Sequence, residues 1–150
     1  MKRESLYLET SVISAYYDER DPTKLEYTRR FWNKLGQYEV IISTVVQAEL
    51  EAIRREALRR KIMDLIKDFR LLEIGEEEEF LSNEYIEEEV IPKKYEDDAL
   101  HIAVATTNAV DFLVSWNLEH IVKVKTRRMV NLINLKHGYK AIEIITPSEL

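Results

Sequence analysis

Acidic side chains occur where short apolar runs of this sequence end, and they are the residues best placed to do chemistry. Glu9 closes the run at residues 5–9, Glu49 lies in a mostly apolar stretch, and Asp98 precedes a series of small residues. A carboxylate near a protein core is costly unless it is paired or binds a metal. Several such groups at one edge would repel one another unless a divalent cation lay between them. Mg²⁺ and Mn²⁺ prefer oxygen ligands and suit phosphate chemistry.

A plainer alternative is that these acids cap helices or lie on the surface, because 28 residues of the 150 are aspartate or glutamate. Other catalytic patterns are missing from the sequence. The chain has no cysteine, which excludes disulfides, zinc–thiolate sites and cysteine nucleophiles. Its three glycines are too few for a phosphate-binding loop, and His101, His120 and His137 are not spaced as zinc ligands are.

The composition is typical of one globular domain, which we place over residues 1–150. Hydrophobic residues make up 45% of the chain and charged residues 33%, so a folded protein is expected. No apolar run approaches the ~20 residues that cross a bilayer, and the N-terminal residues lack the core of a signal peptide. We therefore expect a cytoplasmic protein with no membrane partner. The net charge of -6 argues against a broad basic surface for nucleic acid, but it is compatible with an acidic pocket that holds cations.

Hydrophobic periodicity alternates between short strand-like runs and longer helical ones. Strands are predicted over residues 5–9, 38–44, 71–75, 111–115 and 142–145. Helices are predicted over residues 22–36, 45–50, 62–69, 76–90, 97–108 and 126–137, and Thr10 and Ser11 could cap one more helix start. Strands that alternate with helices indicate an α/β sandwich around a parallel sheet. In such sheets chemistry collects beyond the carboxyl ends of the strands.

Four segments resemble, in order, the motifs of PIN domains. YLETSVISAYYD is similar to the opening of these domains, where a strand ends in an acidic residue followed by Thr-Ser or Thr-Thr, and ISTVVQAELEAI is similar to their second motif. DALHIA and the later LVSWNLEH resemble a VapC-like subgroup of bacterial and archaeal toxins, as does the closing GYKAIEIITPSEL. The resemblance covers nearly the whole chain. It implies a PIN-like three-layer sandwich, in which a central parallel sheet is flanked by helices.

The resemblance also implies which residues form the site. Glu9 stands at the family's first acidic position, which is usually Asp, and Glu49 stands at the second. Asp98 matches the third position, and its neighbour Asp97 is the less favoured ligand. Asn117 stands at the fourth, where many PIN domains have Asp; its amide oxygen could coordinate a metal or hold a metal-bound water. The implied metal ligands are Glu9, Glu49 and Asp98, and Asn117 completes the catalytic set.

The activity that the resemblance implies is that of a Mg²⁺- or Mn²⁺-dependent endoribonuclease, the toxin of a type II toxin–antitoxin pair. Such a protein would hydrolyse RNA phosphodiester bonds, bind a cognate antitoxin and form a homodimer. A degenerate PIN domain that binds RNA or a protein partner without cleaving is the alternative, because Glu9 and Asn117 depart from the usual acids. A receiver-like signalling domain is disfavoured, since the strand that ends at Gly75 lacks a phospho-acceptor Asp.

Several further residues have both a functional and a structural interpretation. Two basic groups could contact RNA phosphates or form solvated faces: Arg54, Arg55, Arg59, Arg60 and Lys61, and then Lys123, Lys125, Arg127 and Arg128. Asp111 is expected at the end of the sheet opposite Asn117, as a structural acid. Packing or capping is the simpler role for His120 and Trp116. The aromatic residues Tyr16, Tyr17, Phe31 and Trp32 could include a dimer face.

Overall fold

A computed structural model describes residues 2–150 and contains a single sheet of five parallel strands. The strands are β1 (Ser5–Leu8), β2 (Glu39–Ser43), β3 (Arg70–Leu72), β4 (Phe112–Val114) and β5 (Glu143–Ile145). Their order in the sheet is β3-β2-β1-β4-β5, and every neighbouring pair is parallel. Leu6, Tyr7 and Leu8 of the central strand are fully buried, as expected for a parallel strand covered on both faces.

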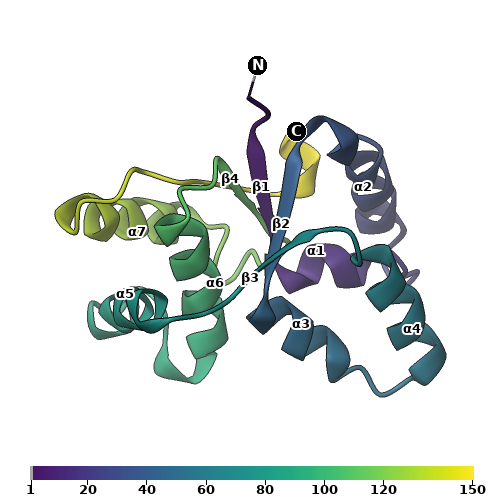
Figure 1. The fold of residues 1–150 in the computed structure, drawn as a ribbon, viewed down its shortest axis with the longest axis horizontal. Helices are drawn as coiled ribbons and strands as arrows, with labels where there is room; N and C mark the ends of the chain where they lie inside the picture. The colour runs from purple at the N-terminus through teal and green to yellow at the C-terminus, as the bar shows by residue number, and fades with distance from the viewer. Residues whose placement is uncertain (1) are drawn as a thin grey trace.

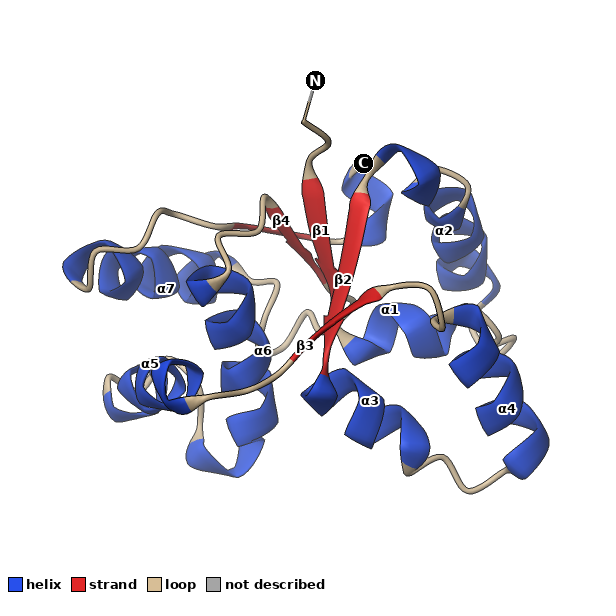
Figure 2. Ribbon diagram, in the orientation of Figure 1, coloured by secondary structure: helices blue, strands red, loops and turns tan. Residues whose placement is uncertain are grey.

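Helices cover both sides of this sheet (Figures 1 and 2). One group contains α1 (Thr10–Ala15), α2 (Pro22–Trp32), α3 (Thr44–Glu51) and α4 (Glu56–Leu65). The other contains α5 (Glu76–Glu87), α6 (Glu96–Thr107) and α7 (Val124–Lys136). Short 3-10 helices lie at Leu35–Gln37, Lys93–Tyr95 and Pro147–Glu149. The predicted three-layer sandwich with a central parallel sheet is therefore confirmed.

Most elements begin and end within a few residues of the predicted bounds, and α4 is the largest departure. It begins at Glu56, six residues before the predicted start at residue 62, and it ends at Leu65 rather than at residue 69. Its first turns contain several basic residues, so the apolar periodicity that would predict a helix is weak in this part of the sequence. Arg60 forms an ion pair with Glu56 at 2.5 Å. Arg54 and Arg55 precede the helix, so the first basic group is only partly helical.

Strand order reverses beside β1, and this reversal locates the site. The chain places β2 on one side of β1 and β4 on the other, with parallel registers in which Tyr7 pairs with both Ile41 and Leu113. In open α/β sheets a crevice forms outside the carboxyl ends of the strands at such a switch. Glu9 and Ser115 directly follow β1 and β4, so both residues lie at this point.

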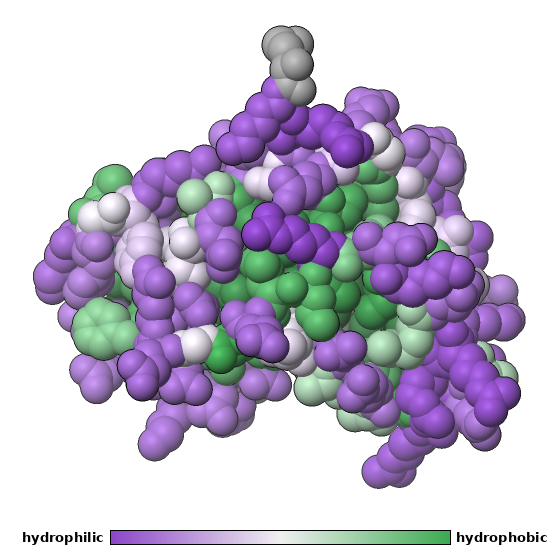
Figure 3. All heavy atoms as spheres, viewed as in Figure 1, coloured by the Kyte–Doolittle hydropathy of each residue, from purple (hydrophilic) through white to green (hydrophobic). Residues whose placement is uncertain are grey.

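Apolar atoms reach the surface in a band over β2 and β3 on the face drawn in Figure 3, and polar side chains surround the band. Leu71 of the edge strand β3 is 44% exposed. An exposed apolar edge of this kind is a common contact surface for other chains. Across residues 2–150, no helix combines the length and the apolarity needed to cross a membrane.

Candidate active site

Glu9 is held at the switch point by hydroxyl groups and backbone. It precedes α1 as the N-cap residue, and its carboxylate accepts hydrogen bonds from the Ser11 backbone N–H at 3.2 Å and from the Ser11 hydroxyl. The Ser115 hydroxyl donates to Glu9 Oε1 at 2.6 Å. Glu9 is only 5% exposed. These donors replace the water that a carboxylate loses on burial, and they fix its orientation.

A series of hydrogen bonds links Glu49 to the ends of β1 and β2. Its Oε1 accepts from the Thr10 hydroxyl at 2.8 Å and lies 2.6 Å from His101 Nε2. His101 Nδ1 lies 2.8 Å from the Tyr7 hydroxyl, which in turn lies 2.7 Å from the Ser43 hydroxyl. Both His101 and Tyr7 are fully buried. This series of hydrogen bonds thus joins the ends of β1 and β2 to α3 and α6.

The His101–Glu49 contact has the character of an ion pair. Burial lowers the pKa of His101, but the hydrogen bond to Glu49 and the nearby charges of Glu49, Glu9 and Asp98 raise it more, so the net shift is upward. Burial raises the pKa of Glu49, but the hydrogen bonds from His101 and Thr10 and the charge of His101 outweigh it, and the net shift is downward. Both shifts favour a protonated imidazole beside an ionised carboxylate.

Asp98 supplies a second carboxylate close to Glu9. Its side chain is 15% exposed near the start of α6, and His120 Nδ1 lies 3.2 Å from its Oδ2. Burial raises the pKa of Asp98 and the charge of Glu9 raises it further, against the opposing effects of His101, His120 and the Asn117 amide. The net upward shift therefore comes first from burial and then from repulsion by the like charge of Glu9. A cation placed beside the two carboxylates would relieve that repulsion.

Asn117 borders this pair, but its amide oxygen is already engaged. Its Oδ1 accepts a hydrogen bond from the His120 backbone N–H at 2.9 Å, while its side chain also interacts with Asp98. The amide therefore positions the turn after β4 and acts on Asp98 as a donor. Asp97 is exposed, and its pKa is raised first by burial and then by the charge of Glu49.

The other candidates lie apart from the carboxylates, with one exception. Asp111 sits at the opposite end of the sheet, as predicted, where its Oδ2 accepts from the Ser5 backbone N–H at 2.8 Å. Trp116 Nε1 donates to the Thr28 hydroxyl at 2.9 Å, which supports the packing role. His120 is the exception, since its ring lies against Tyr95 with centroids 3.9 Å apart and also contacts Asp98.

The carboxylates of Glu9, Glu49 and Asp98 are suitable ligands for a divalent cation, although their side chains are not arranged around one point. Within residues 2–150, no three His, Asp or Glu side chains are disposed as a ready set of metal ligands. The oxygens of Glu9 and Glu49 face hydroxyls and His101 instead. The donor set is nevertheless made of carboxylate oxygens, the ligands that Mg²⁺ prefers. A cation bound between Glu9 and Asp98 would also offset the repulsion between their two negative charges.

His101 and Tyr7 are central to this arrangement, and the sequence does not indicate either of them as a site residue. Thr10 and Ser115 are expected from the sequence either to contact a metal-bound water or phosphate or to cap a helix, and here they donate to Glu49 and Glu9. His101 follows Asp98 by three residues, which puts both on one side of a helix. That spacing was the available signal. The surrounding apolar residues make the same histidine resemble a core residue, so periodicity alone does not distinguish the two roles.

Comparison with known proteins is consistent with the geometry. A family model described as PIN domain matches residues 6–119, a range that contains all four predicted site residues. Among solved structures, FitAcB from Neisseria gonorrhoeae is 13% identical, with a TM-score of 0.64 and coverage of 97% of this chain and 99% of that one. VapBC2 from Rickettsia felis, bound to a promoter DNA fragment, is 12% identical, with a TM-score of 0.60 and coverage of 95% and 98%.

A third similar structure is VapC20 from Mycobacterium tuberculosis, described as a sarcin-ricin loop cleaving toxin. It is 16% identical, with a TM-score of 0.59, and the match covers 72% of this chain and 86% of that one. At such identities the likeness establishes the fold alone. No curated protein matches the sequence significantly.

Proposed function

The chain belongs to the PIN-domain family, and we propose that it is a divalent-metal-dependent endoribonuclease, the toxin of a toxin–antitoxin pair. The observation that carries the proposal is the pair of largely enclosed carboxylates of Glu9 and Asp98 at the switch point, where burial and then the charge of Glu9 raise the pKa of Asp98. A similar fold in VapC20, a toxin that cleaves the sarcin-ricin loop, supports RNA as the substrate class.

Glu9, Glu49 and Asp98 would hold Mg²⁺ or Mn²⁺, with Asn117 beside Asp98. When bound, such a cation polarises the phosphodiester and stabilises the leaving oxygen. It would also offset the repulsion between Glu9 and Asp98.

The chain's own residues orient these carboxylates. Ser115 and Ser11 hold Glu9, while Thr10 and His101 hold Glu49. Partners of this kind fix the direction of a ligand and its basicity, and their loss typically costs about 10- to 100-fold in metal affinity or activity.

The partners follow from the same proposal. Similarity to VapBC2 and to VapBC from Salmonella typhimurium, both solved with DNA, supports an antitoxin as a partner of this chain. A homodimer is proposed from the family resemblance. The aromatic residues first considered for its interface largely contact one another, since Tyr16 lies 4.9 Å from both Tyr17 and Trp32 between ring centroids.

One observation favours a second candidate function, a PIN domain that binds RNA or a protein partner without cleaving. Asn117 takes the place of an acid, and its Oδ1 accepts from the His120 backbone N–H. The fourth position then contributes no negative charge, which weakens the hold on a cation.

Cleavage of a fluorescent RNA pool decides between the two functions. Wild-type protein should cleave in Mn²⁺ or Mg²⁺ and stop in EDTA. Asp98→Asn keeps the shape of the side chain and removes one charge, and activity should fall by at least ~10²-fold. Asp111→Asn is the matched control, because it removes the same charge at the other end of the sheet. Wild-type protein that binds RNA but cleaves none of the pool in any metal would favour the non-cleaving function.

A further inference from the structure

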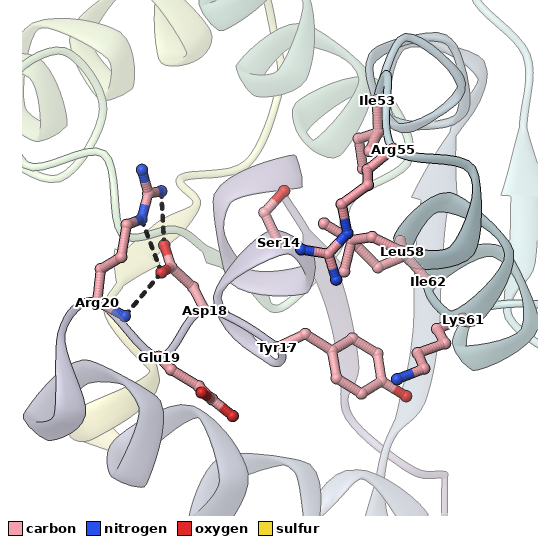
Figure 4. Close-up of a pocket in the computed structure, with 10 residues that line it drawn as sticks. All are labelled: Ser14, Tyr17, Asp18, Glu19, Arg20, Ile53, Arg55, Leu58, Lys61 and Ile62. Carbon is pink, nitrogen blue, oxygen red and sulfur yellow. Dashed lines mark hydrogen bonds and ion pairs between the residues drawn. The ribbon is translucent and has the colours of Figure 1, made fainter.

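A pocket of about 780 Å³ lies between the end of α1 and α4 (Figure 4). Thr10 on α1 donates to Glu49, and Ser14, four residues later, lines the pocket. Ile53, four residues after Glu49, lines it too. Thr10 and Ser14 lie about 6 Å apart along the axis of α1, and the segment from Glu49 to Ile53 runs past the end of α3, so both lead from the carboxylates toward the pocket. A single extended strand of a polymer can therefore reach both places.

Two cations of the pocket have no acidic partner among the described residues. Neither Arg55 nor Lys61 forms an ion pair there, and Lys61 Nζ lies 5.7 Å from the centre of the Tyr17 ring. Two acids, Asp18 and Glu19, also line the pocket. Asp18 is paired with Arg20, whose Nε and Nη2 both lie 2.9 Å from its oxygens. With Arg20, Arg55 and Lys61 against these two acids, the lining has a net positive charge in a chain of net charge -6.

The wall of the pocket adds an aromatic and apolar surface to these charges. Tyr17, Leu58 and Ile62 line it. Figure 4 shows the Arg55 guanidinium directed toward Ser14 and the Lys61 amine beside the Tyr17 ring. Aromatic rings that stack on bases, next to cations that pair with phosphates, are the means by which proteins bind single-stranded nucleic acid. A small anion alone would make no use of the aromatic wall.

We propose that this pocket is a subsite for single-stranded RNA, which holds the nucleotides next to the bond at the carboxylate site. Arg55 and Lys61 pair with backbone phosphate, and the Tyr17 ring stacks on a base. The inference rests on the proposed ribonuclease function and deepens it, because it gives the substrate strand a second place of contact. It also gives a role to Arg55 and Lys61, two members of the first basic group of the sequence.

Binding of a labelled RNA of about 12 nucleotides, measured by fluorescence anisotropy in EDTA, tests the subsite without cleavage. The double variant Arg55→Ala/Lys61→Ala should raise Kd about 10- to 100-fold at about 50 mM salt. It should also reduce the slope of log K against log salt by about 1.4, since each phosphate contact of a single strand contributes about 0.7. The matched control Arg54→Ala/Arg60→Ala removes the same charge from neighbouring residues outside the pocket lining.

Tyr17 tests the stacking independently of charge. Tyr17→Ala should weaken RNA binding by about 5- to 150-fold, whereas Tyr17→Phe should retain it, because the ring remains. Thermal melting of each variant checks that the protein is still folded.

Equal weakening by the two double variants would overturn the subsite, because general electrostatics would then explain the binding. Unchanged RNA affinity together with lost binding of a protein partner would overturn it in favour of a protein-binding pocket. The two proposals fail separately. Pocket-dependent RNA binding by a protein that never cleaves would refute the ribonuclease function alone. Metal-dependent cleavage that Asp98→Asn abolishes, with pocket variants that bind RNA normally, would refute the subsite alone.

Discussion

Asp98→Asn should uncouple the stability of the protein from divalent metal. In the wild type, Mg²⁺ or Mn²⁺ that binds only the folded carboxylates stabilises the protein by mass action. At a metal concentration about 100 times Kd, the free energy of unfolding rises by about 2.7 kcal/mol. For a chain of 150 residues this corresponds to an increase in Tm of about 5–11 °C. If Asp98→Asn weakens metal binding about 100-fold, the same metal concentration stabilises the variant by only about 0.4 kcal/mol, which raises its Tm by roughly 1 °C.

The same substitution should have the opposite effect without metal. Asp98 is 85% enclosed by the rest of the protein and repels Glu9, so a neutral amide at this position should raise the Tm of the metal-free protein. Calorimetric melts of the wild type and the variant, in EDTA and over a metal titration, measure both effects. Asp111→Asn should melt differently from the wild type but respond to metal as the wild type does. Equal metal responses of wild type and Asp98→Asn would refute the reasoning and remove Asp98 from the ligand set.

Three other substitutions test particular contacts. Asn117→Asp should lower the metal-free Tm and enlarge the metal response, because a further carboxylate faces Asp98; a smaller metal response in the same melts would contradict this. His101→Ala should cost about 2–4 kcal/mol in urea unfolding, since a buried ring that bonds Tyr7 and Glu49 is lost; a cost below about 1 kcal/mol would show that the ring is not structural. Asp111→Ala should cost about 1 kcal/mol at neutral pH, a modest figure because the side chain is 36% exposed. The hydrogen bond from the Ser5 backbone and then the charge of Lys140 lower the pKa of Asp111 in the folded protein. The stability that Asp111 contributes is therefore present above its pKa in the unfolded chain and should disappear as the pH falls through its pKa in the folded protein. A stability difference between wild type and Asp111→Ala that persists in acid would refute the assignment.

The layers of the fold could be predicted because buried parallel strands have a simple signature. Residues 38–44 form a nearly continuous apolar run, and β2 occupies 39–43 of it. The start of α4 could not be predicted in the same way. Its first turns carry Arg59 and Arg60 beside Leu58, and a charged helix with few apolar residues shows little periodicity.

The positions of the acids could be predicted, but the directions of their side chains could not. Glu9 and Asp98 were identified by their places after a strand and at the start of a helix. The orientation of Asn117 depends on the His120 backbone N–H, and that contact exists only when the turn after β4 has formed. The role of His101 depends on Tyr7 and Glu49, which are distant in sequence and meet only in the folded sheet.

The hydrogen bond from Ser115 to Glu9 determines how late in synthesis the carboxylate site can be completed. The two residues are 106 positions apart, and the backbone of Glu9 also donates to the Val114 carbonyl at 3.0 Å. Contacts of such long separation form late, after the cost of closing the intervening loop has been met. A nascent chain therefore holds Glu9 only through Ser11 until β4 has left the ribosome, and a fragment that ends before Ser115 lacks the second side-chain donor altogether. Pulse proteolysis of stalled nascent chains should show protection of the Glu9 region only beyond that length.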